Sequence, residues 1–362
     1  MRGLRSRLNV LGVAFGLSVM VPCAQGSTIY RFVDLGPGRA VAINNAGEAA
    51  GWRMNSDGSA TALHFGADGA VLASIPGAQA AALGARGALV GTAFTASGAM
   101  AAVWSGGAAL GALGGAESWA LAANAAGAVA GAGATPSGAV QAFVHSDGVM
   151  TSVGSLGGSW SSAYALNSHG LAVGAAETAS GSFHAFLWDP ASGLRDLGTL
   201  GGLSSYAFAL NDTGQVAGHA QTASGYFRAF LWDSRTGMRD LGTLGGASSY
   251  ASGINNAGHV VGYSWLEGSE VTHAFLFAGG VMVDLNSLFQ GSGWTLTEAL
   301  GINDLGQIVG TALAGGAEHA FRLDPLPAQW HDAAEVHNPE PGTLALVLAG
   351  FFLMWIARRS SN

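Results

Sequence analysis

A long motif repeats almost unchanged within this chain and constrains its fold more than any other feature. HAFLWDPASGLRDLGTLGG at residues 184–202 returns 44 residues later as RAFLWDSRTGMRDLGTLGG at residues 228–246. Self-similarity at this period is typical of repeat architectures rather than of ordinary globular domains. A length of 362 residues would otherwise suggest two or three domains, and the repeat replaces that expectation with one array of similar units.

A shorter motif, A-[LI]-N-x-x-G-x-[VA]-[AV]-G, allows the repeat to be followed along the chain. Each copy is preceded by a segment like Asp-Leu-Gly and followed by one like His-Ala-Phe, and the first three units are eroded. Numbered as units one to seven, the copies lie at residues 42–51, 82–91, 122–131, 165–174, 209–218, 253–262 and 301–310.

Each unit is predicted to contain four short strands. Asn or Asp suits the first position of the N-x-x-G turn, and Gly accepts a positive φ near its end. The apolar and aromatic HAFLW segment is typical of a buried strand, and the Gly content of 58 residues disfavours helical repeats. Four strands in 40–48 residues match a propeller blade, so we expect an all-β fold, a seven-bladed β-propeller.

Composition excludes some classes of function. The net charge of −8 argues against binding a phosphate backbone, so no nucleic-acid partner is expected. The single cysteine, Cys23, falls within residues 1–26, which read as a signal peptide with Arg2, Arg5 and Arg7 before a short apolar stretch. A mature chain would therefore have neither disulfides nor cysteine-ligated zinc.

The C-terminal segment 338–362 resembles the PEP-CTERM sorting signal. Pro339, Glu340 and Pro341 precede an apolar stretch that ends at Arg358 and Arg359. The resemblance implies an exosortase-type processing enzyme as partner and transient insertion into the inner membrane through a hydrophobic helix at residues 343–357. It also implies export to the cell surface or the extracellular space. Residues 27–325 then form the repeat domain, and residues 326–337 form a spacer.

The repeat itself resembles the HAF repeat family of extracellular bacterial proteins. His-Ala-Phe occurs at residues 184–186, 273–275 and 319–321, together with DLGTLGG and the N-x-x-G turn. The resemblance covers most of residues 30–324. The family has no well-defined biochemical activity, so it implies a repeat and a location rather than a reaction.

The recurring histidines and aspartates are interpreted as structural. His184, His273 and His319 share one position of the unit, where Arg228 and Gln141 also occur. Asp34, Asp196, Asp240 and Asp284 recur in the Asp-Leu motif in the same way. A catalytic group is normally unique, whereas a structural hydrogen bond repeats with the fold. We therefore predict no catalytic, cofactor-binding or metal-binding residues.

Aromatic residues after the Gly-Gly turns are the best candidates for ligand binding. Trp119, Trp160, Tyr206 and Tyr250 lie there in successive units and could stack on sugar faces at one end of a propeller, or else pack between blades.

The preferred hypothesis is an exported, non-enzymatic protein of the cell surface or extracellular polymer matrix, with a structural or carbohydrate-binding role. One alternative is a polysaccharide lyase or glycosidase in the propeller channel, using polar residues that interrupt the repeat, such as Arg86, Glu117 or His169. Another is a protein-interaction platform, suggested by fold analogy alone.

Overall fold

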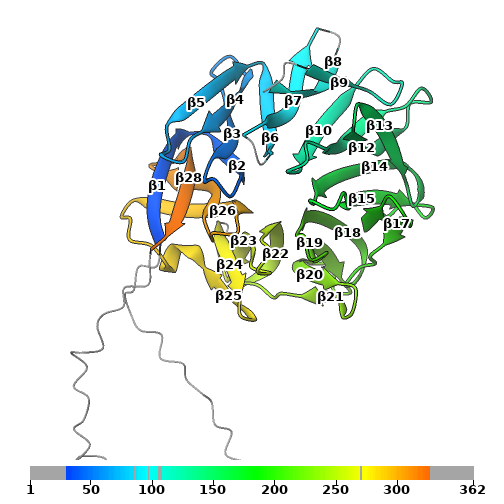
Figure 1. The fold of residues 1–362 in the computed structure, drawn as a ribbon. Coiled ribbons are helices and arrows are strands. Elements are labelled where there is room, and N and C mark those ends of the chain that lie inside the picture. The colour runs from blue at the N-terminus through cyan, green and yellow to red at the C-terminus, as the bar shows by residue number, and fades with distance from the viewer. Residues whose placement is uncertain (1–29, 85–86, 97, 105–107, 270, 327–362) are drawn as a thin grey trace, which may run out of the picture.

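The computed structural model describes residues 30–84, 87–96, 98–104, 108–269 and 271–326. These residues form a ring of β-sheets (Figure 1). Within them, a 3-10 turn lies at Leu285–Ser287, and no helix of this part is long and apolar enough to cross a bilayer. The all-β prediction is confirmed. The predicted signal peptide (1–26), the sorting signal at Pro339, Glu340, Pro341, Arg358 and Arg359, and the predicted C-terminal helix lie outside the described residues.

The strands follow one another along the chain with short connections. Their bounds are β1 Tyr30–Pro37, β2 Arg39–Ile43, β3 Ala49–Met54, β4 Ala60–Phe65, β5 Val71–Pro76, β6 Ala78–Leu83, β7 Leu89–Thr95, β8 Gly98–Val103, β9 Ala108–Gly111, β10 Ser118–Ala123, β11 Val129–Ala134, β12 Val140–Ser146, β13 Val149–Gly154, β14 Gly157–Leu166, β15 Ala172–Thr178, β16 Phe183–Asp189, β17 Gly193–Asp196, β18 Gly201–Leu210, β19 Val216–Thr222, β20 Phe227–Asp233, β21 Gly237–Asp240, β22 Gly245–Ile254, β23 Val260–Leu266, β24 Thr272–Ala278, β25 Val281–Asp284, β26 Trp294–Ile302, β27 Ile308–Ala314 and β28 Ala317–Pro325.

The prediction of seven separate blades is wrong for the described residues. Hydrogen bonding gives five four-stranded blades and one eight-stranded sheet, which contains β10 to β17. The link is one parallel pair, Val140 of β12 with Trp160 of β14. Units three and four are thereby joined into one continuous sheet.

The His-Ala-Phe motif places its phenylalanine in the core. Phe186, Phe230, Phe275 and Phe321 lie on the third strand of their units and are fully buried, with the preceding alanine also buried. Each such ring contributes about 2–3 kcal/mol by burial. The aromatic residue therefore fills the space between neighbouring sheets, and the small alanine lets the sheets approach closely.

Buried serines on several first strands bond to the preceding unit. Ser205, at a fully buried position of β18, donates from its hydroxyl to the Gly198 carbonyl and accepts from the Ala185 N–H of β16. Ser249 makes the same pair of bonds with Gly242 and Ala229. The serine hydroxyl thus satisfies two backbone groups that would otherwise be unpaired inside the protein.

The N-terminal strand closes the ring. β1 pairs antiparallel with β28, so the last sheet has the order β1-β28-β27-β26 (Figure 1). Arg322, only 2% exposed, pairs with Asp324, which also accepts from Arg31 at 2.7 Å. Arg322 Nη1 donates to the Gly47 carbonyl in the first unit. A buried ion pair with satisfied hydrogen bonds therefore links the two ends of the repeat domain.

Candidate binding sites of the central channel

Each N-x-x-G turn is ordered by the side chain of its own asparagine. In unit six, Asn255 Oδ1 accepts from the N–H groups of Ala257 and His259 at 3.1 and 3.0 Å. The Gly258 N–H donates to the Asn255 carbonyl, and Gly258 has a φ of 78°, a conformation that favours glycine. The motif is therefore a turn in which the asparagine replaces missing backbone partners.

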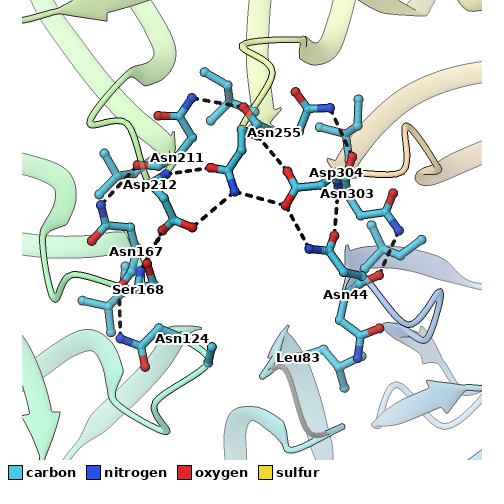
Figure 2. Close-up of a pocket in the computed structure, with 18 of the residues that line it drawn as sticks. Asn44, Leu83, Asn124, Asn167, Ser168, Asn211, Asp212, Asn255, Asn303 and Asp304 are labelled. Carbon is cyan, nitrogen blue, oxygen red and sulfur yellow. Dashed lines mark hydrogen bonds between the residues drawn. The ribbon is translucent and has the colours of Figure 1, made fainter.

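The same asparagines also bond to one another around one mouth of the channel. In five units the side-chain Nδ2 donates to the backbone carbonyl of the asparagine in the next unit (Figure 2). The bonds run from Asn124 to Asn167, to Asn211, to Asn255, to Asn303 and to Asn44, at 2.9–3.2 Å. We call this set the asparagine ring. It encloses the outer end of a pocket of about 280 Å³.

The asparagine ring is interrupted in unit two, where glycine replaces asparagine. Gly84 has no side chain to donate to the Asn124 carbonyl. Asn44 donates to Glu48 in its own unit at 2.9 Å. A β-carbon at Gly84 would lie 3.5 Å from the Asn124 carbonyl oxygen, which is ordinary contact.

The residue after each asparagine extends this network at the mouth. Asn256 Nδ2 donates to the carboxylates of both Asp212 and Asp304, at 3.2 and 3.1 Å. Asn45 Nδ2 also donates to Asp304. Burial raises the pKa of Asp212, but hydrogen bonds from Ser168 and Asn256 outweigh it and hold that pKa below its usual value. Asp212 is therefore ionised at neutral pH, and both mouth carboxylates accept hydrogen bonds from neighbouring amides.

Below the mouth, the channel has an apolar throat. The first strand of each unit has a β-bulge near its end. In five units the bulged residue lines the channel, and these residues are Val41, Ala81, Leu121, Tyr164 and Phe208. Tyr164 and Phe208 stack at 4.7 Å with an interplanar angle of 8°, and burial raises the pKa of Tyr164 to about 12. The throat thus offers aromatic and aliphatic surface without an ionised group among these residues.

At the far end of the throat, a third pocket of about 400 Å³ opens between units one, two and three. Its lining contains the throat residues Val41, Ala81 and Leu121, so it continues the channel. We call it the aromatic pocket, and its distinctive residues are Trp52, Gln79, Thr92, Phe94 and Trp119. Rings and uncharged hydrogen-bonding groups therefore face one space of ligand size.

Of the four predicted rim aromatics, the structure places Trp119 in this pocket and the other three in a packed cluster. Trp160 contacts Phe183 edge-on at 5.3 Å. Tyr206 lies beside Phe183, and both Tyr206 and Tyr250 contact His219, at 5.2 and 4.9 Å. The predicted set is thus divided between a pocket and an inter-sheet cluster.

His219 lies within that aromatic cluster without a charged neighbour among its ring contacts. Tyr206, Phe208, Phe227 and Tyr250 surround it at 4.9–5.2 Å. Its Nδ1 has no hydrogen-bond partner in the described part of the chain. Burial lowers the pKa of His219 to about 4. The imidazole is therefore neutral at pH 7.

The recurring histidines pair with the recurring aspartates of their own sheets. His184 Nδ1 lies 2.8 Å from Asp196, His273 lies 2.7 Å from Asp284, and the closing pair His319–Asp34 follows the same pattern at 3.0 Å. Asp196 Oδ1 also accepts from the Gly198 N–H, which orders the following turn. The pairs repeat with the fold and hold the fourth strand to the third.

The residues that interrupt the repeat do not converge on one site. Glu117 precedes β10, at the end of the channel where the aromatic pocket opens. His169 belongs to a turn at the opposite mouth. Arg86 lies outside the described residues. In the described part of the chain, no group of three or more His, Cys, Asp or Glu side chains is arranged to hold a metal ion.

Sequence reasoning missed four residues of the aromatic pocket. Trp52, Gln79, Thr92 and Phe94 belong to the eroded units one and two, where the alignment of repeats is weakest. Thr92 pairs with Gln79, and the corresponding pairs are Ala132 with Trp119 in unit three and His219 with Tyr206 in unit five. Because residue size at both positions varies between units, the sequence pattern carried no signal for this pocket.

No family model matches the chain, and no curated protein matches it in sequence. Among solved structures, the β-propeller domain of the Trilobed protease from Pyrococcus furiosus has 11% identity and a TM-score of 0.53, over 83% of this chain and 95% of that one. An acylaminoacyl peptidase in complex with Z-Gly-Gly-Phe-chloromethyl ketone has 12% identity and a TM-score of 0.51, over 82% of this chain and 52% of that one. The chain thus spans about half the length of that peptidase.

The lectin BP39L from Burkholderia pseudomallei has 9% identity and a TM-score of 0.46, over 83% of this chain and 98% of that one. At these identities the likeness concerns the fold alone. The chain adopts a β-propeller fold.

Completing the asparagine ring should stabilise the protein. Gly84→Asn is expected to raise the free energy of unfolding by about 1 kcal/mol, because its Nδ2 can donate to the Asn124 carbonyl. Gly84→Ala is the control, since it gains a β-carbon and loses unfolded-state freedom without adding a donor. Urea denaturation should rank the asparagine variant above the alanine variant. Equal or reversed stabilities would contradict the role of the ring.

The free energy of unfolding should decrease as the pH is lowered, because of His219. Its pKa is about 4 in the folded state against about 6.5 unfolded, so the unfolded state binds more protons between these values. The resulting loss is absent above pH 6.5, grows as the pH falls, and reaches about 2.5 kcal/mol near pH 4.5. His219→Tyr introduces the residue that unit six has at the corresponding position, Tyr263, and should lack this loss in urea titrations at pH 7 and 4.5. If the free energy of unfolding of the unaltered protein and that of His219→Tyr depend equally on pH, His219 is not the source of the loss.

Proposed function

We propose that this protein is an exported, non-enzymatic propeller that binds neutral saccharides in the aromatic pocket. The observation that supports this function is the lining of that pocket. Trp52, Trp119 and the 51% exposed Phe94 contribute rings, and Gln79 and Thr92 contribute an amide and a hydroxyl.

The chemistry of these groups suits a sugar. Aromatic side chains present an apolar face to the C–H groups of a pyranose while their edges remain compatible with water. An amide both donates and accepts hydrogen bonds, as does a hydroxyl, and sugar hydroxyls need both. A pocket of about 400 Å³ falls within the range of small-molecule sites.

The lining favours binding over catalysis. Its residues are apolar, aromatic or uncharged, so the pocket offers none of the carboxylates or imidazoles that glycoside cleavage uses. The carboxylates of Asp212 and Asp304 lie at the opposite mouth and are bridged by Asn256. A general acid would need a raised pKa, whereas that of Asp212 is lowered.

The location belongs to the same proposal. A signal peptide at residues 1–26 and a sorting segment at 338–362 would deliver the propeller to the cell surface or polymer matrix. β1 and β28 lie side by side, so the chain enters and leaves the ring at one place (Figure 1). A tether there would leave the channel ends accessible to an extracellular polysaccharide.

Removing a ring from the aromatic pocket should weaken saccharide binding. Trp119→Ala and Trp52→Ala are each expected to weaken it about tenfold, because an aromatic contact contributes about 1 kcal/mol or more. Calorimetric titration of the full chain with neutral glucan, mannan and galactan trisaccharides measures the loss. Leu305→Ala, at an exposed residue of a mouth turn, is the matched control and should bind as the unaltered chain does.

Two results would contradict the proposed function. One is unchanged affinity in both tryptophan variants when the unaltered chain binds a trisaccharide. The other is release of reducing ends from a neutral polysaccharide during the titration, which would favour a glycosidase in the channel.

A further inference from the structure

We infer a second saccharide-binding pocket between units five and six, which would make the propeller bivalent. We call it the Tyr226–Trp265 pocket. It has a volume of about 410 Å³ and is lined by Tyr226, Gly245, Gly246, Ala247, Ser248, Trp265, Leu266, Glu267, Gly268 and Ser269. The inference rests on the proposed function, because it assigns the same class of ligand to both pockets.

The starting observation is a contact that repeats in units four and five. A long polar side chain at the end of the second strand folds over the Gly-Gly turn and accepts from the backbone beyond it. Glu177 Oε2 accepts from the Ser159 N–H at 2.8 Å. Gln221 Oε1 accepts from the Leu203 N–H at 3.0 Å.

Unit six breaks this contact. The corresponding side chain is Trp265, and the corresponding backbone N–H belongs to Ala247. An indole has a donor but no acceptor, so Trp265 cannot accept from that N–H. Ala247 is exposed. Trp265 thus supplies no acceptor where Glu177 and Gln221 supply one, and Ala247 and the indole of Trp265 both line the pocket.

Glycine keeps the floor of this pocket flat. A β-carbon at Gly246 would lie 2.5 Å from the backbone carbon and oxygen of Trp265, so no larger residue fits there. Gly245 has a φ of 107°, which also favours glycine. The floor is therefore backbone, and a ligand can approach the plane beside Trp265 closely.

Tyr226 forms the facing wall and is held in place by its backbone. Its carbonyl accepts from the Thr222 N–H at 2.9 Å and from the Thr222 hydroxyl at 3.0 Å. Its side chain is 52% exposed. The corresponding residue of unit four is Ser182, so this ring is a second departure from the repeat at the same place.

The surrounding groups define the ligand class. Two aromatic rings suit the face of a pyranose, and the Ala247 N–H with the hydroxyls of Ser248 and Ser269 suits its oxygens. Glu267 adds an exposed carboxylate, which repels uronates and accepts from sugar hydroxyls. The pocket therefore fits a neutral sugar, as the aromatic pocket does.

Both pockets open at the same end of the propeller. The first strand of each unit ends at an N-x-x-G turn, at the mouth with the asparagine ring. The first strands therefore begin at the other end of the channel. Gln79 is near the start of β6 and Gly245 starts β22. Two weak sites on one face give a polysaccharide with many identical sugars a much higher avidity than either site alone.

Trisaccharide titration of the full chain tests the second pocket. We expect two sites in the unaltered chain, and about one after Trp265→Gln, which restores the side chain found at Gln221 and so preserves the fold. Trp119→Ala should weaken binding at the other site about tenfold. Polygalacturonate is the anionic control and should not bind. Binding to dextran, as a neutral polymer, should fall about a hundredfold when either pocket is lost, because avidity disappears.

The outcomes separate the two claims. One site in the unaltered chain, unchanged by Trp265→Gln but weakened by Trp119→Ala, would overturn the second pocket and leave the proposed function standing. Loss only in Trp265→Gln would overturn the aromatic pocket and retain the Tyr226–Trp265 pocket. Failure of all three neutral trisaccharides and of dextran to bind would overturn both.

Discussion

The structure depends on one side chain, the asparagine of the N-x-x-G turn, which makes two kinds of bond at once. Its Oδ1 accepts from its own turn, and its Nδ2 donates to the same residue in the next unit. The first bond fixes a local strand connection, and the second fixes the position of neighbouring units. A local sequence preference is thereby converted into the closure of a ring. At Gly84 the asparagine is missing, and with it the side-chain amide that would donate to the Asn124 carbonyl.

Regular and irregular positions of the repeat have different roles. Phe186 and Ser205 are fully buried, and counterparts of each occur in other units, so they are explained by packing and backbone pairing. His184 and Asp196 likewise recur as pairs within their sheets. The candidate binding surfaces lie at positions that vary from unit to unit, such as those of Trp52 and Trp265. Chemistry in a repeat protein of this kind is therefore best sought at its exceptions.

Much of the fold could be predicted from the sequence, because its strands and turns are determined locally. The N-x-x-G turn and the buried HAF strand follow from residue preferences, and the structure contains both. The blade count was wrong because the pairing of Val140 with Trp160 depends on how two units meet in space. No local pattern in either residue indicates that contact.

The candidate sites were predictable only in part, for a similar reason. Trp119 was identified from its place after a Gly-Gly turn, but so were Tyr206 and Tyr250, which pack against His219. Whether such a ring packs or faces a pocket depends on its neighbours across strands. His219 fills the space in unit five, whereas Ala132 beside Trp119 leaves room.

A structure of the full chain crystallised with a neutral trisaccharide tests the central claim most directly. That claim is that the regular repeat builds the scaffold and that its departures bind the ligand. The account predicts density for the sugar against Trp52 and Trp119. Density at the asparagine ring, or at the His184–Asp196 pair, with an empty aromatic pocket would contradict it.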